Sequence, residues 1–162
     1  MMAISASTLT TTVSEAITLN GQTFGNTVTK SFSSIKDIFV RIIPVPSGST
    51  ITTLYTVGTT DTGSQFTPTS LKYARITNKD TANALSIFID NEAGHEVLYK
   101  LDAGCSYIIN LHEDSIMAET TTGTDLTGDN SATYAAGSAA ITQVRAQAFN
   151  AAVDVEVFVA AT

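Results

Sequence analysis

Apolar and polar residues alternate with a period of two along most of the chain. Val13, Ile17 and Leu19 are separated by polar or small residues, and this alternation places successive side chains on opposite faces of a strand. Asn20-Gly21 follows, and both residues tolerate the positive φ of a tight turn. The pattern therefore predicts a strand, a turn, and a second strand over residues 26–32.

The next segment, DIFVRII at residues 37–43, is apolar at nearly every position. A strand of this kind is covered on both faces, so we expect a central strand or an interface strand. Pro44 and Pro46 are predicted to end it, because proline cannot donate to a strand ladder. Residues 49–57 predict another strand, and the Thr- and Gly-rich residues 58–70 predict a loop.

Four short β-type runs follow at a spacing of roughly ten residues. They are LKYARIT (71–77), ALSIFID (84–90), HEVLYKL (95–101) and CSYIINL (105–111). The segments between them consist of Asn, Asp, Gly and other turn residues. This block predicts an antiparallel meander or a Greek key.

The C-terminal third contains a long polar segment followed by a hairpin. A short strand is expected at residues 115–118, and the Thr-, Gly- and Ala-rich residues 119–137 predict a long loop that is mobile or ordered by a neighbouring chain. Residues 139–149 and 152–160 predict two strands joined at Asn150-Ala151. Alternate valines from Val153 to Val159 share one face, which we expect to lie in the core.

About nine or ten short strands, with no window of helical periodicity, indicate an all-β protein. We expect one domain over residues 1–162, built as an antiparallel β-sandwich or jelly roll, with an open barrel as the alternative. A flexible N-terminal arm (residues 1–12) and the loop at 119–137 complete the predicted organisation.

Composition agrees with this fold and excludes several classes of function. The 162 residues are 43% apolar, enough for one core, and only 14% charged, with threonine the commonest residue. The formal net charge is −7, and the eight Lys and Arg residues are scattered, so nucleic-acid binding is not expected. The polar N-terminus lacks the features of a signal peptide, and no apolar run is long enough to cross a bilayer, so we expect no membrane association.

Cysteine and histidine offer little chemistry. Cys105 is the only cysteine, so no intrachain disulfide can form, which fits folding in a reducing cytoplasm. We expect Cys105 to act as a small buried hydrophobic residue. His95 lies near Glu92 and Glu96 in an expected hairpin end. The run His112-Glu113-Asp114 resembles a metal cluster, but consecutive residues at a strand end point to opposite faces.

The acidic residues do not form a recognisable catalytic or metal site either. Asp90 with Glu92, or Asp125 with Asp129, would face each other only by an accident of folding. The stretch DLTGD at 125–129 lacks the order of ligands and the closing Glu of a calcium loop. No nucleophile motif is present. We therefore predict a protein that is not an enzyme, with no catalytic, cofactor or metal residues, and no small-molecule ligand.

Two stretches of the chain resemble a known family. LKYARITNKDTANALSIFID through HEVLYKLDAGCSYIINLHEDS, and the closing ITQVRAQAFNAAVDVEVFVAAT, resemble strands and turns of small β-sandwich decoration or cement proteins of tailed bacteriophages. The resemblance implies a structural subunit of the virion, assembled in the host cytoplasm, whose partners are the major capsid protein and copies of itself. It implies no functional residue. A β-domain without signal peptide, disulfide or glycosylation sequon is also what a virion subunit requires.

Two alternatives stay open. The first is a head–tail connector or another tail-associated subunit. The second is a carbohydrate-binding module, although such modules stack sugars on exposed aromatic rings, and this chain has no Trp and five Tyr. These tyrosines are Tyr55, Tyr73, Tyr99, Tyr107 and Tyr134.

Overall fold

The computed structural model describes residues 5–58, 65–67, 69–91, 96–110, 116–117, 138–139 and 141–162. These residues form 15 strands and no helix, which confirms the predicted all-β class. The number exceeds the nine or ten strands expected because the N-terminal hairpin is divided into four strands and three other strands have only two residues.

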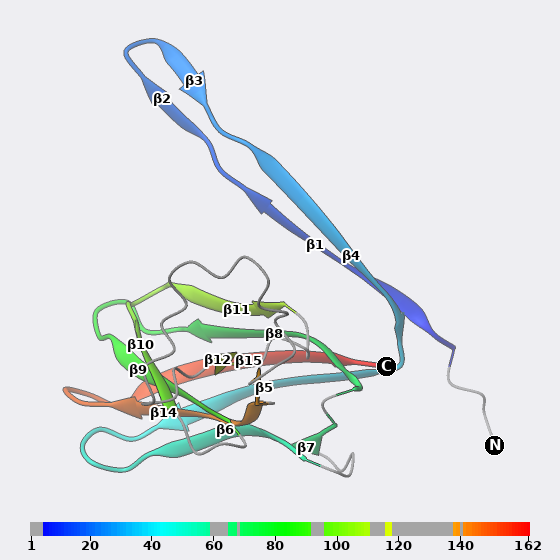
Figure 1. Ribbon diagram of the computed structural model, residues 1–162. Helices are drawn as coiled ribbons and strands as arrows, with labels where there is room; N and C mark the ends of the chain where they lie inside the picture. The colour runs from blue at the N-terminus through cyan, green and yellow to red at the C-terminus, as the bar shows by residue number, and fades with distance from the viewer. Residues whose placement is uncertain are drawn as a thin grey trace, which may run out of the picture.

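The body of the molecule is a sandwich of two antiparallel four-stranded sheets (Figure 1). The β5 sheet has the order β11-β8-β15-β5, and the β6 sheet has the order β10-β9-β14-β6, with β7 added in parallel beside β6. Their strands are β5 (Asp37–Val45), β6 (Thr52–Val57), β7 (Gln65–Phe66), β8 (Leu71–Asn78), β9 (Leu85–Asn91), β10 (Glu96–Leu101), β11 (Ser106–Asn110), β14 (Ile141–Ala148) and β15 (Val153–Ala161). A separate pair joins β12 (Ile116–Met117) to β13 (Ser138–Ala139).

The strand order identifies the sandwich as a jelly roll. Among the eight body strands, each step along the chain crosses to the other sheet, except the step from β9 to β10. The pairs β9–β10, β8–β11, β6–β14 and β5–β15 are therefore nested around one hairpin, as in two interlocked Greek keys. The four runs between residues 71 and 111 thus follow the Greek-key alternative. A meander would have kept all four in one sheet.

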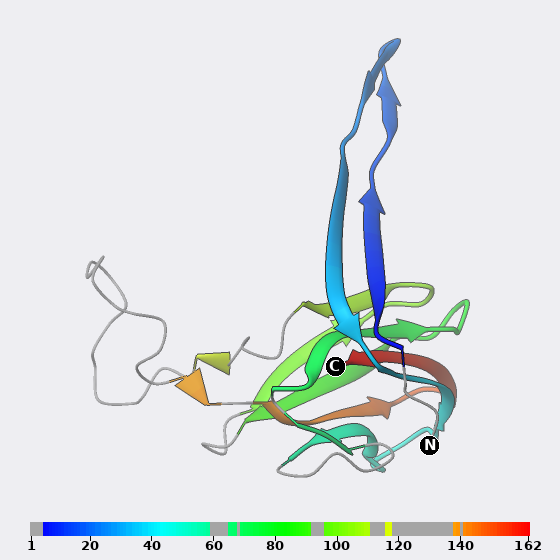
Figure 2. The same ribbon diagram turned by 90° about the vertical axis from the view of Figure 1, so that its right-hand side faces the viewer.

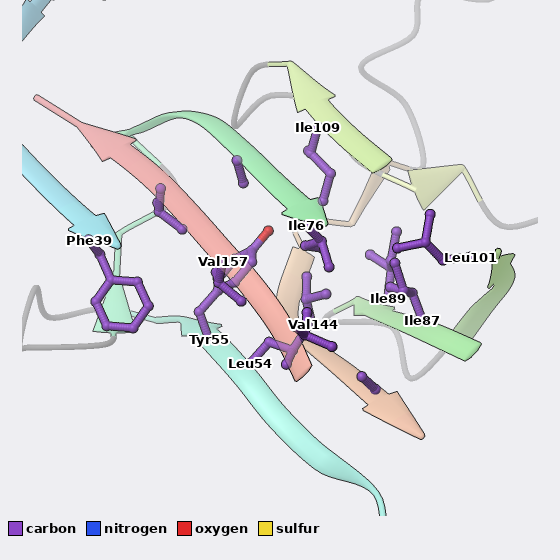
Figure 3. Packing of buried hydrophobic residues seen from close by; sticks show 14 of the residues in the cluster. Phe39, Leu54, Tyr55, Ile76, Ile87, Ile89, Leu101, Ile109, Val144 and Val157 are labelled. Carbon is purple, nitrogen blue, oxygen red and sulfur yellow. The ribbon is translucent and has the colours of Figure 1, made fainter. Parts of the chain in front are cut away.

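The core lies between the inner faces of the two sheets (Figure 3). Leu54 and Tyr55 of β6 and Val144 of β14 face Ile76 of β8 and Val157 of β15. The alternate valines of the last strand are fully buried, as their spacing predicted. Burial also raises the pKa of the Tyr55 hydroxyl, because the phenolate would lose its hydration.

A buried asparagine holds the crossing from β8 to β9. The Asn78 side chain is completely inaccessible, and its Nδ2 donates to the carbonyl oxygens of Asn83 at 2.9 Å and of Leu101 at 3.2 Å. Its Oδ1 accepts from the backbone N–H of Asp80 at 2.9 Å. Asn78 therefore ties the crossing loop to the end of β10, where polar backbone groups would otherwise be buried without partners.

The strand at residues 37–43 differs from the expectation of a central strand covered on both faces. β5 lies at the edge of its sheet, with β15 as its partner strand in the described part of the chain. Pro44 does not end the strand. It pairs with Asp154, since an edge strand tolerates a missing N–H. Every apolar residue of this segment is strand-forming, but only alternate ones face the core.

The N-terminal segment forms a long hairpin that leaves the body, which we call the arm (residues 7–35) (Figures 1 and 2). It consists of β1 (Ser7–Ser14), β2 (Ile17–Leu19), β3 (Gln22–Phe24) and β4 (Thr27–Ile35), with β1 paired to β4 and β2 to β3. The sequence predicted an arm of residues 1–12 only. Residues 7–12 lie instead in the first strand of this hairpin, and residues 1–4 fall outside the described residues.

Candidate interaction site

The base of the arm packs against the outer face of the β5 sheet. Phe32 and Ile35 form a buried apolar cluster with Tyr73 and Ala160, and the ring centroids of Phe32 and Tyr73 are 5.7 Å apart. Leu9 and Phe158 cover this cluster. Desolvation here raises the pKa of the Tyr73 hydroxyl, against the opposing effect of nearby Arg75. The arm is thus attached to the body by side-chain packing as well as by the chain itself.

One face of the arm carries hydroxyl groups. Across the two strands, Thr and Ser residues share hydrogen bonds in pairs at donor–acceptor distances of 3.0–3.4 Å. The pairs are Thr10–Ser31, Thr12–Thr29, Ser14–Thr27 and Thr18–Thr23. Threonine is β-branched and polar, so this face supports the strand conformation and remains compatible with water.

The opposite face of the arm alternates apolar pairs with polar ones, since Thr11 pairs with Lys30, and Glu15 faces Asn26, between the apolar pairs. The register places Val13 opposite Val28 and Ile17 opposite Phe24, and Leu19 is next to the tip. These five side chains are 51–60% exposed, although Leu9 and Phe32, which continue the same face at the base, are covered by the body. We call Val13, Ile17, Leu19, Phe24 and Val28 the arm stripe. Side chains of this kind are seldom left uncovered together on a monomer's surface.

Two backbone features shape the arm. At its tip, Asn20 and Gly21 have φ values of 52° and 77°, as the tight turn predicted from this dipeptide requires. In the middle, a Cβ placed on Gly25 would lie 1.9 Å from the carbonyl oxygen of Glu15 on the facing strand. No residue other than glycine fits there without a shift of the backbone.

A groove of about 510 Å³ lies between the arm and the outer face of the β5 sheet. The arm contributes residues 9–13, Val28 and Lys30, and the sheet contributes the ring of Phe158, Ile108 and the guanidinium of Arg75. Arg75 is ion-paired with Glu156 and lies 5.8 Å from the Phe158 ring centroid, so its charge is already compensated by the body. The walls of the groove are mainly apolar, which suits packing better than acid–base chemistry.

The same outer face presents a second apolar row on its edge strand. Ile38, Val40 and Ile42 of β5 are 54–60% exposed, and we call them the β5 strip. Val40 pairs with Phe158, and Ile38 pairs with Ala160. The β5 strip therefore adjoins the cluster on which the arm's own base packs.

A cluster of three charged residues lies on the β6 sheet and is structural in character. Arg145 of β14 binds Asp90 through two hydrogen bonds of 2.7 and 2.8 Å, and it also binds Glu96 at 2.6 Å. The hydrogen bonds to Asp90 are the main reason that the pKa of Arg145 is raised. The sequence presented Asp90 as one member of a possible carboxylate pair. In the structure its carboxylate is ion-paired with Arg145 on the neighbouring strand.

Most residues that the sequence singled out for chemistry lie outside the described part of the chain. These are Glu92, His95, His112, Glu113, Asp114, Asp125, Asp129 and Tyr134. Cys105 is described, and the expectation that it is buried is wrong. It is exposed just before β11, because the turn at Ala103-Gly104 leaves it outside the strand.

The tyrosines considered for sugar stacking are mostly covered. Tyr55 and Tyr73 are buried and Tyr107 is half-buried against the core, whereas Tyr99 is 46% exposed. Within the described residues, no three His, Cys, Asp or Glu side chains are grouped so that they could hold a metal ion. The same residues include no helix of the length and apolarity needed to cross a bilayer.

Sequence reasoning missed the arm stripe, although its signal was present. Before the Asn20-Gly21 turn, the large apolar residues all stand at odd positions, and after it, as far as Phe32, they all stand at even positions, although polar residues occupy other positions of the same set. They are Leu9, Val13, Ile17 and Leu19, then Phe24, Val28 and Phe32. Combining that turn with the alternation would have placed both sets on one face of a hairpin. Comparisons of the chain with protein-family models, with curated proteins and with solved structures gave no match.

Proposed function

We propose that this protein is a non-enzymatic structural subunit of a tailed-bacteriophage virion, and that it decorates the capsid and stabilises the head. The observation that carries the proposal is the arm: a hairpin that leaves a compact jelly roll and exposes an apolar stripe along one face. A subunit that holds other proteins together needs a rigid body and a segment that reaches beyond it.

The chemistry of the described surface supports a role in assembly. The arm stripe and the β5 strip are exposed and apolar, and Arg75 beside the groove is paired with Glu156. Burying eight apolar side chains that are each about half exposed stabilises a contact by roughly 1 kcal/mol per side chain before the costs of association. A surface of this kind favours a protein partner over a small charged substrate.

The partner proposed on the virion is the major capsid protein, together with further copies of this chain. A decoration subunit gains its effect by bridging shell subunits, so that separating them requires breaking contacts with the bridge as well. The arm reaches a neighbour that the body does not touch. Its neutral charge suits a contact made by packing, whose strength changes little with salt.

The test is biochemical and uses intact particles. Virions from a phage whose genome encodes the chain are purified by density gradient, and the copy number of the chain is measured against the shell protein by quantitative mass spectrometry. We expect a fixed ratio of this chain to the shell protein, as one set of equivalent positions on the shell lattice would give. A decoration role also predicts that particles lacking the chain lose DNA at lower temperature, and that the added recombinant protein restores them.

Other outcomes separate the alternatives. A ratio of only about a dozen copies per particle would indicate a connector or tail position, and absence from particles would overturn the proposal. Binding to polysaccharides in a pull-down, lost on substitution of the exposed Tyr99, would support the carbohydrate-binding alternative instead.

A further inference from the structure

We propose that the arm stripe of one copy of this chain packs on the β5 strip of a second copy, so that the protein associates with itself through an arm-to-sheet contact. This inference does not depend on the virion role, because it concerns two surfaces that the chain itself presents. Both are described above, on the arm and on the outer face of the β5 sheet.

The first argument is that the chain already makes a contact of this kind with itself. At the base of the arm, the apolar face packs on the outer face of the β5 sheet through Phe32 and Tyr73, covered by Leu9 and Phe158. The arm stripe lies on that same face of the arm, beyond the Thr11–Lys30 pair, and the β5 strip is the continuation of that same sheet surface. Each exposed surface thus extends one half of an existing apolar contact.

The second argument is reach. Each leg of the arm runs for about 13 residues, or roughly 43 Å at 3.3 Å per residue, whereas the nine residues of β5 span roughly 30 Å. The arm also diverges from the body instead of lying flat on it (Figures 1 and 2). Val13 and Val28 line the groove over their own sheet, but the β5 strip is not part of that groove and stays 54–60% exposed, so the arm of the same chain leaves it uncovered.

The third argument is charge. The arm contains one acidic residue, Glu15, and one basic residue, Lys30, so residues 7–35 have a net charge of zero. The whole chain has a formal net charge of −7, and the remainder therefore carries all of it. Two acidic bodies repel each other, but a neutral arm can join them while keeping the bodies apart. The arm has no cluster of basic residues that would select a nucleic acid or an anionic lipid surface.

The fourth argument is that one repeated contact covers both exposed surfaces, which together contain eight apolar side chains that are 51–60% exposed. When every copy gives its arm to one neighbour and accepts an arm from another, each copy buries both the arm stripe and the β5 strip. Such a head-to-tail contact closes into a ring or exchanges arms within a pair.

The experiment compares the full chain with three triple variants by sedimentation equilibrium. The arm variant is Val13→Thr, Ile17→Thr and Val28→Thr. The strip variant is Ile38→Thr, Val40→Thr and Ile42→Thr. Threonine keeps the β-branched shape and replaces a methyl group of valine, or the ethyl branch of isoleucine, with a hydroxyl, so the strands are preserved. The control variant changes the hydroxyl face of the arm instead: Thr12→Ser, Thr18→Ser and Thr27→Ser.

We expect the unaltered chain and the control variant to show a mass that rises with concentration above the 17.0 kDa of one copy. The arm and strip variants are each expected to associate at least a hundredfold more weakly. Far-ultraviolet circular dichroism and melting temperature, unchanged in all four proteins, establish that the variants are folded.

Mixing the two weakened variants gives the sharpest test. The strip variant keeps an intact arm, and the arm variant keeps an intact strip, so an equimolar mixture should form a 1:1 complex of twice 17.0 kDa. A contact between two arms would leave this mixture without a mixed complex and would overturn the proposal. It is also overturned if the unaltered chain stays monomeric at about 100 µM, where a contact of even tens of micromolar affinity is populated.

Other occupants of the arm stripe have their own outcomes. A monomeric chain whose arm variant no longer binds intact phage shells would make the shell protein the occupant, and a monomeric chain that floats with phosphatidylcholine vesicles would make it a bilayer. Both results overturn the self-association. Conversely, a chain that self-associates as described but is absent from particles leaves this inference standing and removes the virion role.

Discussion

Replacing Asn78 with alanine should lower the free energy of unfolding more than replacing any other polar side chain in the β8–β9 crossing. The side chain makes three hydrogen bonds, to the carbonyl oxygens of Asn83 and Leu101 and from the N–H of Asp80. It is completely buried, so water cannot replace these partners in the folded state. At about 1 kcal/mol for each net hydrogen bond, the loss of unfolding free energy is about 3 kcal/mol.

The assay is urea denaturation followed by circular dichroism at the β-sheet band, together with thermal melting. For a chain of this length, about 3 kcal/mol corresponds to a melting temperature lower by about 6–12 °C. Asn83→Ala is the matched control, since the Asn83 side chain makes a single hydrogen bond of 3.3 Å to Asp80. We expect it to cost less than about 1 kcal/mol. Equal losses for the two variants would refute the assignment of Asn78 as the residue that holds the crossing.

Three further predictions concern the arm, pH and metal ions. Gly25→Ala should disrupt the pairing of the distal arm, because the Cβ of the new alanine would meet the Glu15 carbonyl oxygen. We expect faster proteolysis at the arm, and a melting temperature of the body that changes by no more than a few degrees. The pKa of Asp80 is lowered mainly by hydrogen bonds from the N–H groups of Ala82 and Asn83. Its carboxylate therefore stabilises the fold at pH values above the unfolded-state pKa. This contribution is lost as the pH falls through the lower folded-state pKa. Asp80→Asn should therefore flatten the acid limb of a stability–pH curve measured below about pH 5. Adding EDTA should leave the melting temperature unchanged, and a decrease reversed by calcium would contradict this.

How far the sequence predicts this fold depends on the range over which each signal acts. The Asn20-Gly21 turn, the buried valines of β15 and the four short runs from 71 to 111 are local or period-two signals, and they are confirmed as strands and turns over the residues that the structure describes. The sheet to which each strand belongs is different. β5 pairs with β15, more than a hundred residues away, and nothing in DIFVRII shows which of its apolar side chains will face another layer.

The candidate site was harder to predict for the same reason. Neither the arm stripe nor the β5 strip contains a catalytic or ligating residue type, so a search for chemistry passes over both. Their meaning depends on exposure, and exposure follows from the tertiary arrangement. The sequence indicated an interface strand at residues 37–43 as one of two possibilities; Val40 and its neighbours are exposed, and the interface itself stays a prediction.

The pairing of β5 with β15 also sets an order of events during synthesis. The arm pairs residues that are at most 28 positions apart, so it can form as soon as it leaves the ribosome. The β5 sheet needs β15, whose last strand residue is Ala161, near the C-terminus. A nascent chain therefore presents its arm stripe well before it has a β5 strip to offer. On a polysome, an early arm could pack on the sheet of a copy already completed nearby, but two unfinished chains could not join each other.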